Sequence, residues 1–440
     1  MRLALSEAKG DETMIQVLFI ALLFLFICSV PIAISLGLSS VITLKMNALP
    51  LSVLAQNIFE SLDSFTLMAI PFFILAGNLM QTGGIAKRLI GLANALVGWF
   101  RGGLGSVAVL TSMFFATLSG SSSATTAAIG SSLIPEMTKK KYPKPFATAI
   151  TASSGELGAI IPPSIPMIVY GLVANVSVGS LFIAGILPGV FIGISLMVTV
   201  IIIARVKKFD QVEVITVSEW SRNLWIAFRQ SLFAMLMPII ILGGIYFGLF
   251  TPTEAAVVAV FYSLIIGLFV YKELKWSDLG PIFTKSAIST SIILVIVAFA
   301  SVFAYILTIE QVPHKLSDLV ISLSDSPLVF ILLTNIFLLI TGMFIETLAA
   351  IIILGPILAP VAVLYGIDPI HFGMIMIVNL AIGMVTPPLG VNLFVACEIA
   401  GLRIEQLIRP VLIFLAVLIF DLLIISYWAP LSTWLPSIIG

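Results

Sequence analysis

Two pairs of consecutive prolines in apolar surroundings are the strongest candidates for a binding site in this chain. Gly158 leads into Pro162 and Pro163, and Gly383 leads into Pro387 and Pro388, at an offset of 225 positions (387 − 162). Proline removes a backbone donor and clashes with the preceding turn, so each pair is expected to end a helix. Unwound backbone inside a membrane has no water to bond, and it persists mainly where it lines a site.

A run of small and hydroxyl residues precedes the first break. Hydroxyl groups and freed carbonyls are the oxygen ligands that a hard cation such as sodium prefers. Backbone N–H groups at the start of a half-helix could instead face an anionic solute. Close packing of small residues between membrane helices is the structural alternative. The candidates in this run are Ser119, Gly120, Ser121, Ser122, Ser123 and Thr125.

A second candidate segment leads directly into the first proline pair. Its carbonyls at 158–161 are expected to be free for ligands, because the prolines cannot continue the helix. Its acid, Glu156, lies in an apolar stretch, where acids are costly and often functional, although local capping or pairing would also explain it. The candidates in this segment are Ser153, Ser154, Gly155, Glu156, Gly158, Pro162 and Pro163.

The second half of the chain carries matching segments at the same offset. Glu346 corresponds to Ser121, and Asn379 corresponds to Ser154. Amide and hydroxyl groups again gather near a helix break, so all four segments could form one site at a repeat interface. The second-half candidates are Glu346, Thr347, Asn379, Gly383, Thr386, Pro387, Pro388 and Asn392.

Composition identifies the elements that must hold these segments. Hydrophobic residues make up 60% of the chain, charged residues 10%, and the mean hydropathy is +1.21. Apolar stretches long enough to cross a bilayer recur throughout, including 15–34, 180–204 and 286–306. We therefore predict an all-α polytopic membrane protein with roughly ten or more crossings and partial crossings. The net charge of zero predicts no nucleic-acid partner.

The polar residues divide the chain into four parts. We predict a polar N-terminal tail at 1–14, a first repeat half at 15–204, a polar connector at 205–230 and a second repeat half at 231–440. Trp220–Arg229 mixes aromatic and basic residues, as an interfacial amphipathic helix does.

The lysines predict opposite sidedness for the two halves. Lys139, Lys140, Lys141 and Lys144 form the densest basic cluster, which positive-inside bias assigns to the cytoplasm. The corresponding second-half turn carries Asp368 and no Lys or Arg, which favours an inverted-topology repeat with broken helices meeting near the midplane. A parallel duplication with differently charged loops is the alternative.

Several other motifs have ordinary structural explanations. The pattern of Thr251, Pro252 and Glu254 is typical of a capped helix start, with Thr at the cap, Pro at the first helical position and Glu three residues after the cap. No stretch supplies the Gly-Lys-Ser/Thr ending of a phosphate-binding loop, and the two histidines lack metal-ligand spacing. We find no intramembrane arginine to pair with a carboxylate, so we expect charge recognition to rest largely with another protein.

The chain resembles the large membrane (M) subunit of TRAP transporters, the tripartite ATP-independent periplasmic transporters. The matching stretches are LSGSSSATTAAIGSSLIPEM, SGELGAIIPPSIPMIVYG, GLFTPTEAAVVAV, GMFIETLAAIIILGPILAPVA and MVTPPLGVNLFVA. Their order and spacing agree with that family from about residue 15 to the C-terminus, and jointly they are specific.

The resemblance implies an elevator-type transporter of the bacterial inner membrane, with two re-entrant helical hairpins. It implies sodium ions as the coupling species, with no nucleotide and no transition metal. It also implies two partners, a small membrane (Q) subunit and a periplasmic substrate-binding protein (P). Carrying the motifs over, we expect sodium near Ser119, Gly158, Gly383 and Thr386, with substrate bound by the same segments.

The predicted function is therefore sodium-coupled import of a carboxylated organic solute, either a C4-dicarboxylate or a sialic-acid-like molecule. The principal alternative is a stand-alone, ion-coupled carrier or exchanger of organic anions that needs no binding protein. An intramembrane enzyme using Ser153 or Ser154 lacks a base nearby in sequence, and we do not predict an enzyme. A channel is a further alternative, which saturable sodium-dependent uptake would eliminate.

Overall fold

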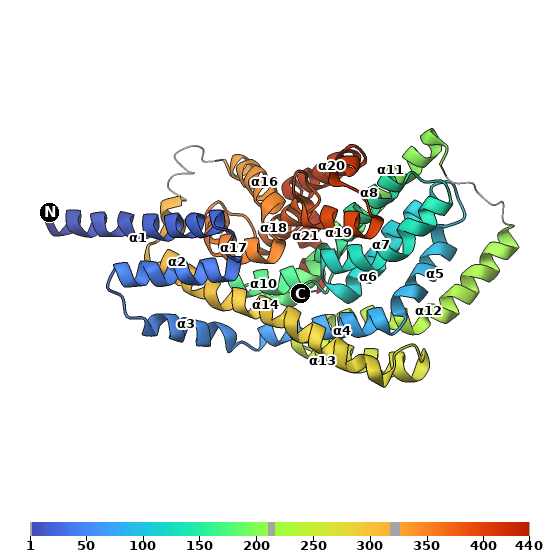
Figure 1. Ribbon diagram of the computed structural model, residues 1–440, viewed down its shortest axis with the longest axis horizontal. Coiled ribbons are helices and arrows are strands. Elements are labelled where there is room, and N and C mark those ends of the chain that lie inside the picture. Colours follow the sequence, from blue (N-terminus) through green and yellow to red (C-terminus); the bar gives the residue numbers. More distant parts are fainter. Residues whose placement is uncertain (1, 210–215, 317–325, 440) are drawn as a thin grey trace.

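The computed structural model describes residues 2–209, 216–316 and 326–439, and every regular element in these ranges is helical (Figure 1). Seven helices in these ranges are long and apolar enough to cross a membrane, or nine if each of two bent pairs counts as one span. Shorter apolar helices accompany them. The protein is an all-α polytopic membrane protein, so the prediction from composition is confirmed.

The helices can be divided into two groups, and most of the first lies below the second in Figure 1. One group, called here the frame group, runs along the lower side in that view. Its longest member is α14, which packs along α2 and α3, while α13 packs along α4. The frame group comprises α1 (Arg2–Ile27), α2 (Ile32–Met46), α3 (Ser52–Leu62), η1 (Thr66–Met68), α4 (Ala69–Thr82), α5 (Ile85–Val97), α12 (Val217–Tyr246), α13 (Pro252–Ile265), η2 (Ile266–Val270) and α14 (Trp276–Ile309).

The remaining helices form the hairpin group, named for its two helical hairpins, α6–α7 and α16–α17. Each hairpin packs beside a helix that is broken near a proline pair. The hairpin group comprises α6 (Gly103–Ser119), α7 (Ser122–Lys139), α8 (Lys144–Gly155), α9 (Leu157–Ile160), α10 (Ile165–Val173), α11 (Val178–Lys207), α16 (Pro327–Phe344), α17 (Thr347–Leu364), α18 (Pro369–Gly383), α19 (Val391–Ala400), α20 (Ile404–Tyr427) and α21 (Pro430–Ile439).

Helix boundaries in the hairpin group recur at one offset. The first helix of each hairpin ends at 119 and at 344, and the second begins at 122 and at 347 (344 − 119 and 347 − 122 both equal 225). The helix after each hairpin begins at 144 and at 369, again 225 positions apart (369 − 144). The spacing seen in the prolines therefore extends to the ends of the helices around them.

Both proline pairs interrupt a helix, as predicted. In the first half the helical segments on either side of the break are bent by 43°. In the second half α18 ends at Gly383 and α19 begins at Val391, with the proline pair between them. Both Pro-Pro peptide bonds are cis.

The apolar stretch at 15–34, predicted as one crossing, is instead two helices. α1 ends at Ile27 and α2 begins at Ile32, with Ser29 in the left-handed region between them (φ 60°). Pro31 explains the break, because it disfavours helical geometry in the residue before it. The prediction of a single span was wrong here, and the two helices pack against each other.

The predicted N-terminal tail and the predicted connector are both more helical than expected. α1 begins at Arg2, so most of the predicted tail at 1–14 continues the first helix. The connector at 205–230 is largely absorbed by α11, which runs to Lys207, and by α12, which begins at Val217. Trp220–Arg229 is therefore the first part of a 30-residue helix rather than a separate interfacial helix, and residues 210–215 lie outside the described ranges.

The predicted helix start at Thr251 is confirmed. The Thr251 side chain accepts from the Glu254 N–H at 3.3 Å, and the Glu254 carboxylate accepts from the Thr251 N–H at 2.8 Å. This reciprocal pair satisfies two donors that a helix start would otherwise leave unpaired.

Replacing Thr251 by Ala should therefore lower the stability of the folded protein by about 1 kcal/mol, because the cap is lost at the start of α13. Thermal unfolding in detergent would show a lower melting temperature for this variant. Thr251→Ser keeps the hydroxyl and should retain most of the stability; equal melting temperatures for Ala and wild type would contradict the capping role.

Candidate functional site

The tip of the first hairpin is built from small residues that let the chain reverse within three positions. α6 ends at Ser119, Gly120 adopts φ 60°, and Ser121 is extended at the start of α7. A left-handed φ is readily adopted by glycine, since it lacks a Cβ. The tip is thus a tight turn, and its hydroxyl groups lie close to one another.

Oxygen atoms gather just behind this tip. The Ser119 and Thr125 hydroxyls lie 2.7 Å apart, and the Thr125 hydroxyl donates to the Ser121 carbonyl at 2.9 Å. Gly158 of the broken helix packs against the same group, because a Cβ at that position would collide with the Ser121 carbonyl and the Thr125 hydroxyl. The structure therefore brings together two of the positions near which sodium is predicted, Ser119 and Gly158.

The carbonyls before the first proline pair are only partly available as ligands. Ser164 caps α10 by accepting from the Met167 N–H, and its hydroxyl donates to the Ala159 carbonyl at 2.5 Å. One of the four carbonyls predicted to be free is therefore already bonded. The break is also tied to the hairpin, since the Ile165 N–H donates to the Gly120 carbonyl at 3.2 Å.

The second hairpin repeats this arrangement with different side chains. Glu346 precedes α17, and the Thr347 hydroxyl lies 2.9 Å from the Met384 sulfur. The Gly390 N–H donates to the Met343 carbonyl at 3.2 Å, and Gly390 lies 225 positions after Ile165 (390 − 165). Each hairpin tip is thus held to its broken helix by a main-chain hydrogen bond.

Gly383 lies where the second broken helix touches its hairpin. A Cβ at Gly383 would collide with the backbone of Gly342, so the two helices meet backbone to backbone. The Thr386 hydroxyl, one turn further on, donates to the Ile382 carbonyl at 2.8 Å. The other two positions near which sodium is predicted, Gly383 and Thr386, therefore lie together at this second break.

A cavity of about 540 Å³ lies between the two hairpin tips and the frame group. The hairpin group contributes six of the predicted site residues to its wall: Ser119, Ser121, Ser122, Ser123, Glu346 and Thr347. The frame group contributes polar residues that sequence reasoning missed: Asn78, Gln81, Lys285 and Ser289. The cavity is therefore the place where the two predicted halves of the site meet.

Lys285 is a basic residue on the cavity wall that the sequence-based prediction did not include. It is the only basic residue on the cavity wall, and no ion pair involving it occurs in the described ranges. Lys285 directly precedes the apolar stretch at 286–306, where a basic residue at the end of a span is ordinary, so no local signal in the sequence pointed to it.

The cavity wall carries one basic and one acidic side chain, two helix starts and several hydrogen-bond donors. α7 and α17 both begin at its wall, and each helix start carries a partial positive charge of about half an elementary charge. Lys285 is the basic residue on this wall and Glu346 the acidic one. Hydroxyl and amide groups supply further donors, including Asn78, which also donates to the Ser286 hydroxyl at 2.9 Å.

The other predicted site residues do not line this cavity. Ser154 bonds to Ser112 at 3.0 Å, while Asn379 donates to Asn335 at 2.9 Å. Asn335 in turn donates to Ser426 at 3.0 Å, so this buried network joins α16, α18 and α20. Pro162 and Pro163 are buried, whereas Pro387 and Pro388 are more accessible. The residues that lie behind the cavity wall are Gly120, Thr125, Ser153, Ser154, Gly155, Glu156, Gly158, Asn379, Gly383, Thr386 and Asn392.

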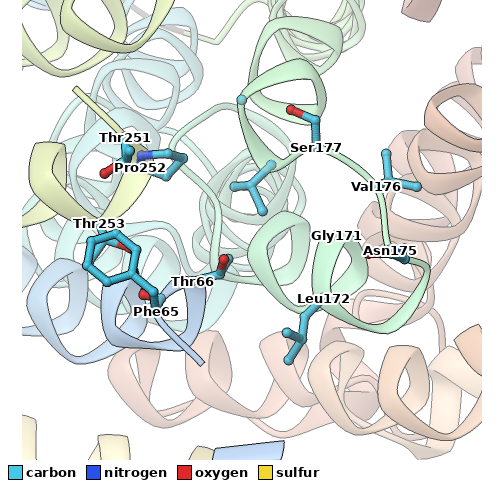
Figure 2. Close-up of a pocket in the computed structure, with 12 residues that line it drawn as sticks. Phe65, Thr66, Gly171, Leu172, Asn175, Val176, Ser177, Thr251, Pro252 and Thr253 are labelled. Atoms are coloured by element: carbon cyan, nitrogen blue, oxygen red, sulfur yellow. Dashed lines mark hydrogen bonds between the residues drawn. The ribbon is translucent and has the colours of Figure 1, made fainter. Parts of the chain in front are cut away.

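A second cavity of about 320 Å³ also lies between the two groups. Figure 2 shows Thr251, Pro252 and Thr253 of the frame group on one side and Val176 and Ser177 on the other. At the edge of this cavity, the Thr253 hydroxyl donates to the Phe65 carbonyl at 2.9 Å. None of the predicted site residues and no charged residue lines this cavity, so it offers no counter-charge for an anionic solute.

The fold and the main cavity together define a polytopic membrane transporter. A solved structure of similar fold is that of the YdaH transporter from Alcanivorax borkumensis, with a TM-score of 0.62 and 16% identity. The similarity covers 86% of this chain and 88% of that one. At this identity the likeness concerns the fold alone.

Residues 19–431 match the family described as the tripartite ATP-independent periplasmic transporter, DctM component, and the chain belongs to this family. It is 47% identical to the C4-dicarboxylate TRAP transporter large permease protein DctM of Pseudomonas aeruginosa, over 92% of this chain and 94% of that protein. It is 38% identical to the sialic acid TRAP transporter large permease protein SiaM of Vibrio cholerae, over 89% of this chain and 91% of that one.

A further relative has a different construction. The isethionate TRAP transporter permease protein DctMQ of Oleidesulfovibrio alaskensis is 43% identical over 94% of this chain, but the match covers only 65% of that longer protein. The chain is thus the large membrane component of a transporter that works with other TRAP subunits, not an enzyme. It is a multi-pass protein of the bacterial inner membrane.

Proposed function

We propose that this chain is the sodium-coupled membrane subunit that imports a small organic anion, with a C4-dicarboxylate or a sialic-acid-like carboxylate as the first candidates. The names of its relatives support carboxylated solutes. The isethionate relative extends the range to a sulfonate, which carries the same single negative charge as a carboxylate.

The observation that carries this proposal is the main cavity. It is lined by two helix starts and by Lys285, and hydroxyl and amide groups surround them. A volume of about 540 Å³ falls within the range of pockets that enclose small molecules. We assign the solute's anionic head to Lys285 and to the start of α7, and its polar body to Asn78 and the serines of the first tip.

The oxygen groups behind the two tips support sodium coupling. Ser119, Thr125 and the Ser121 carbonyl supply hard oxygen atoms beside Gly158. A sodium ion there, and another near Gly383 and Thr386, would order the tips that form the cavity wall. Solute and sodium would then each raise the other's affinity, as thermodynamic linkage requires.

The positions of two equivalent turns support an inverted repeat. Tyr142 packs on Phe209, which puts the α7–α8 turn beside the end of α11. Tyr365 stacks on Phe330, which puts the α17–α18 turn beside the start of α16. The end of α11 and the start of α16 lie toward opposite ends of the molecule in Figure 1. Equivalent turns at opposite ends are what an inverted repeat requires.

The position of the cavity supports an elevator movement. Its walls come partly from the frame group, through α4 and α14, and partly from the hairpin group. We propose that the hairpin group carries the solute past the frame group, which alternately exposes the cavity to the two sides of the membrane. The partners we propose are a small membrane subunit, as a separate chain, and a periplasmic binding protein that delivers the solute.

Uptake into proteoliposomes tests the whole proposal. The chain is reconstituted with the small membrane subunit, and labelled C4-dicarboxylates, sialic acids and isethionate are offered with and without binding protein. We expect saturable uptake that requires both a sodium gradient and the binding protein. Equal uptake with potassium in place of sodium would refute the coupling. Uptake without any binding protein would instead favour the alternative, a stand-alone carrier or exchanger.

A further inference from the structure

A buried polar cluster lies behind the main cavity, where the first hairpin, the first broken helix and α19 meet. We call it the Glu156 cluster. Each side chain in it is at most 4% exposed. Its members are Ser122 and Thr126 of α7, Ser153 of α8, Glu156 at the start of α9, and Asn392 of α19.

Two of these side chains, Asn392 and Ser122, reach the Glu156 carboxylate, and the other two lie on neighbouring turns of α7 and α8. The Asn392 amide donates to one oxygen of the Glu156 carboxylate at 2.5 Å, and the Ser122 hydroxyl faces the same carboxylate. Thr126 follows Ser122 by one helical turn, and its hydroxyl fills the space where a Cβ on Gly155 would lie. Ser153 precedes Glu156 by three positions, so both occupy one face of the chain as it leaves α8.

The cluster holds more oxygen atoms than hydrogen bonds. One oxygen of Glu156, the amide oxygen of Asn392 and the hydroxyls of Thr126 and Ser153 have no hydrogen-bond partner among the residues that the structure describes. No ion pair involving Glu156 occurs in those ranges either. An unpaired buried carboxylate is costly, and so is each unsatisfied polar atom around it. A cation bound at the carboxylate, with neighbouring oxygen atoms as further ligands, would offset this cost.

We propose that the Glu156 cluster binds a sodium ion. Carboxylate, amide and hydroxyl oxygens are hard ligands, and a single negative charge suits a monovalent cation better than a divalent one. This ion is distinct from the two expected near Ser119 and Gly158 and near Gly383 and Thr386. Those positions offer hydroxyls and backbone carbonyls, whereas the Glu156 cluster offers a charge.

The site would couple the ion to the solute and the two halves to each other. Ser122 belongs both to the cluster and to the wall of the main cavity. Asn392 comes from the second half of the chain, while the other members come from the first. A sodium ion here would fix the start of α7 against α19, which orders one wall of the cavity before solute arrives. The inference rests on the sodium coupling proposed above.

Sodium binding can be measured without transport. The chain with its small membrane subunit, in lipid nanodiscs, is heated at a series of sodium chloride concentrations, with choline chloride holding ionic strength constant. We expect Glu156→Gln to raise the sodium concentration for half-maximal stabilisation by at least about tenfold, the change for 1.4 kcal/mol of binding free energy. In proteoliposomes, the number of sodium ions per solute should fall by one. Thr148→Val, which lies on α8 with its hydroxyl bonded to the Lys144 carbonyl, should match wild type in both measurements.

The outcomes separate this inference from the proposal beneath it. If wild type shows no sodium response in either measurement, sodium coupling itself fails. If wild type responds and Glu156→Gln responds identically with an unchanged ion count, the cluster holds no sodium and coupling through the other positions stands. If Glu156→Gln does not fold, the sodium affinities of the milder variants Ser153→Ala and Thr126→Val test the site instead. Loss of sodium affinity in that pair supports the site, and wild-type affinity overturns it.

Discussion

Replacing Lys285 by Gln is expected to raise the solute concentration for half-maximal uptake by about 10- to 100-fold. Among the residues that the structure describes, Lys285 is the only basic one on the wall of the main cavity. A hydrogen bond to a charged group contributes about 1.5–3 kcal/mol, and each 1.4 kcal/mol corresponds to a tenfold change in affinity. The measurement is initial uptake rate against solute concentration, at saturating sodium and binding protein.

A second lysine provides the control for the change in net charge. Lys87 on α5 is exposed and does not line the cavity, so Lys87→Gln should keep the wild-type concentration dependence. Lys285→Arg retains the charge and should be less affected than Lys285→Gln. Wild-type uptake by Lys285→Gln would mean that the solute does not touch this wall, and the cavity would lose its assigned role.

Replacing Gly383 by Ala should be among the most damaging single changes in the chain. The added methyl group would collide with the backbone of Gly342, which cannot move aside as a flexible side chain can. Overpacking of this kind costs about 1–3 kcal/mol or more, and here it also displaces the second hairpin from its broken helix. We expect a lower melting temperature, a reduced yield of folded protein and loss of most uptake.

Gly243 offers a matched control for this substitution. It lies within α12, and a Cβ there would meet no atom within 4 Å. Gly243→Ala should leave uptake unchanged and stabilise the protein by up to about 1 kcal/mol, because alanine lowers the entropy of the unfolded chain. If Gly383→Ala retained wild-type stability and uptake, the contact with Gly342 would not be essential.

The parts of the fold that could be predicted from sequence depend on local chemistry. Proline pairs end helices wherever they occur, so the breaks at Pro162 and Pro387 could be located. The cap at Thr251 was predicted for the same reason, since all its partners lie within three residues. The offset of 225 could be extended from the prolines to the helix ends because a repeat preserves spacing as well as residue type.

The parts that could not be predicted depend on which helices face each other. No residue near Lys285 in the sequence indicates that α14 lies opposite the first hairpin tip. The part of the main cavity's wall that the frame group supplies could therefore not be predicted. The link from Glu156 to Asn392 spans 236 positions and has no local signal. The turn at Pro31 could have been predicted, but the apolar residues on both sides hid it within an apparent single span.

The main-chain bonds at the two hairpin tips carry a consequence for mutational scanning. The Ile165 N–H reaches Gly120, and the Gly390 N–H reaches Met343, without using any side chain. An alanine scan would leave both donors in place and would therefore report the solute-binding and ion-binding side chains while passing over the contacts that close the tips. Only proline at position 165 or 390 removes a donor, so a scan intended to map how the site is held together must include proline as well as alanine.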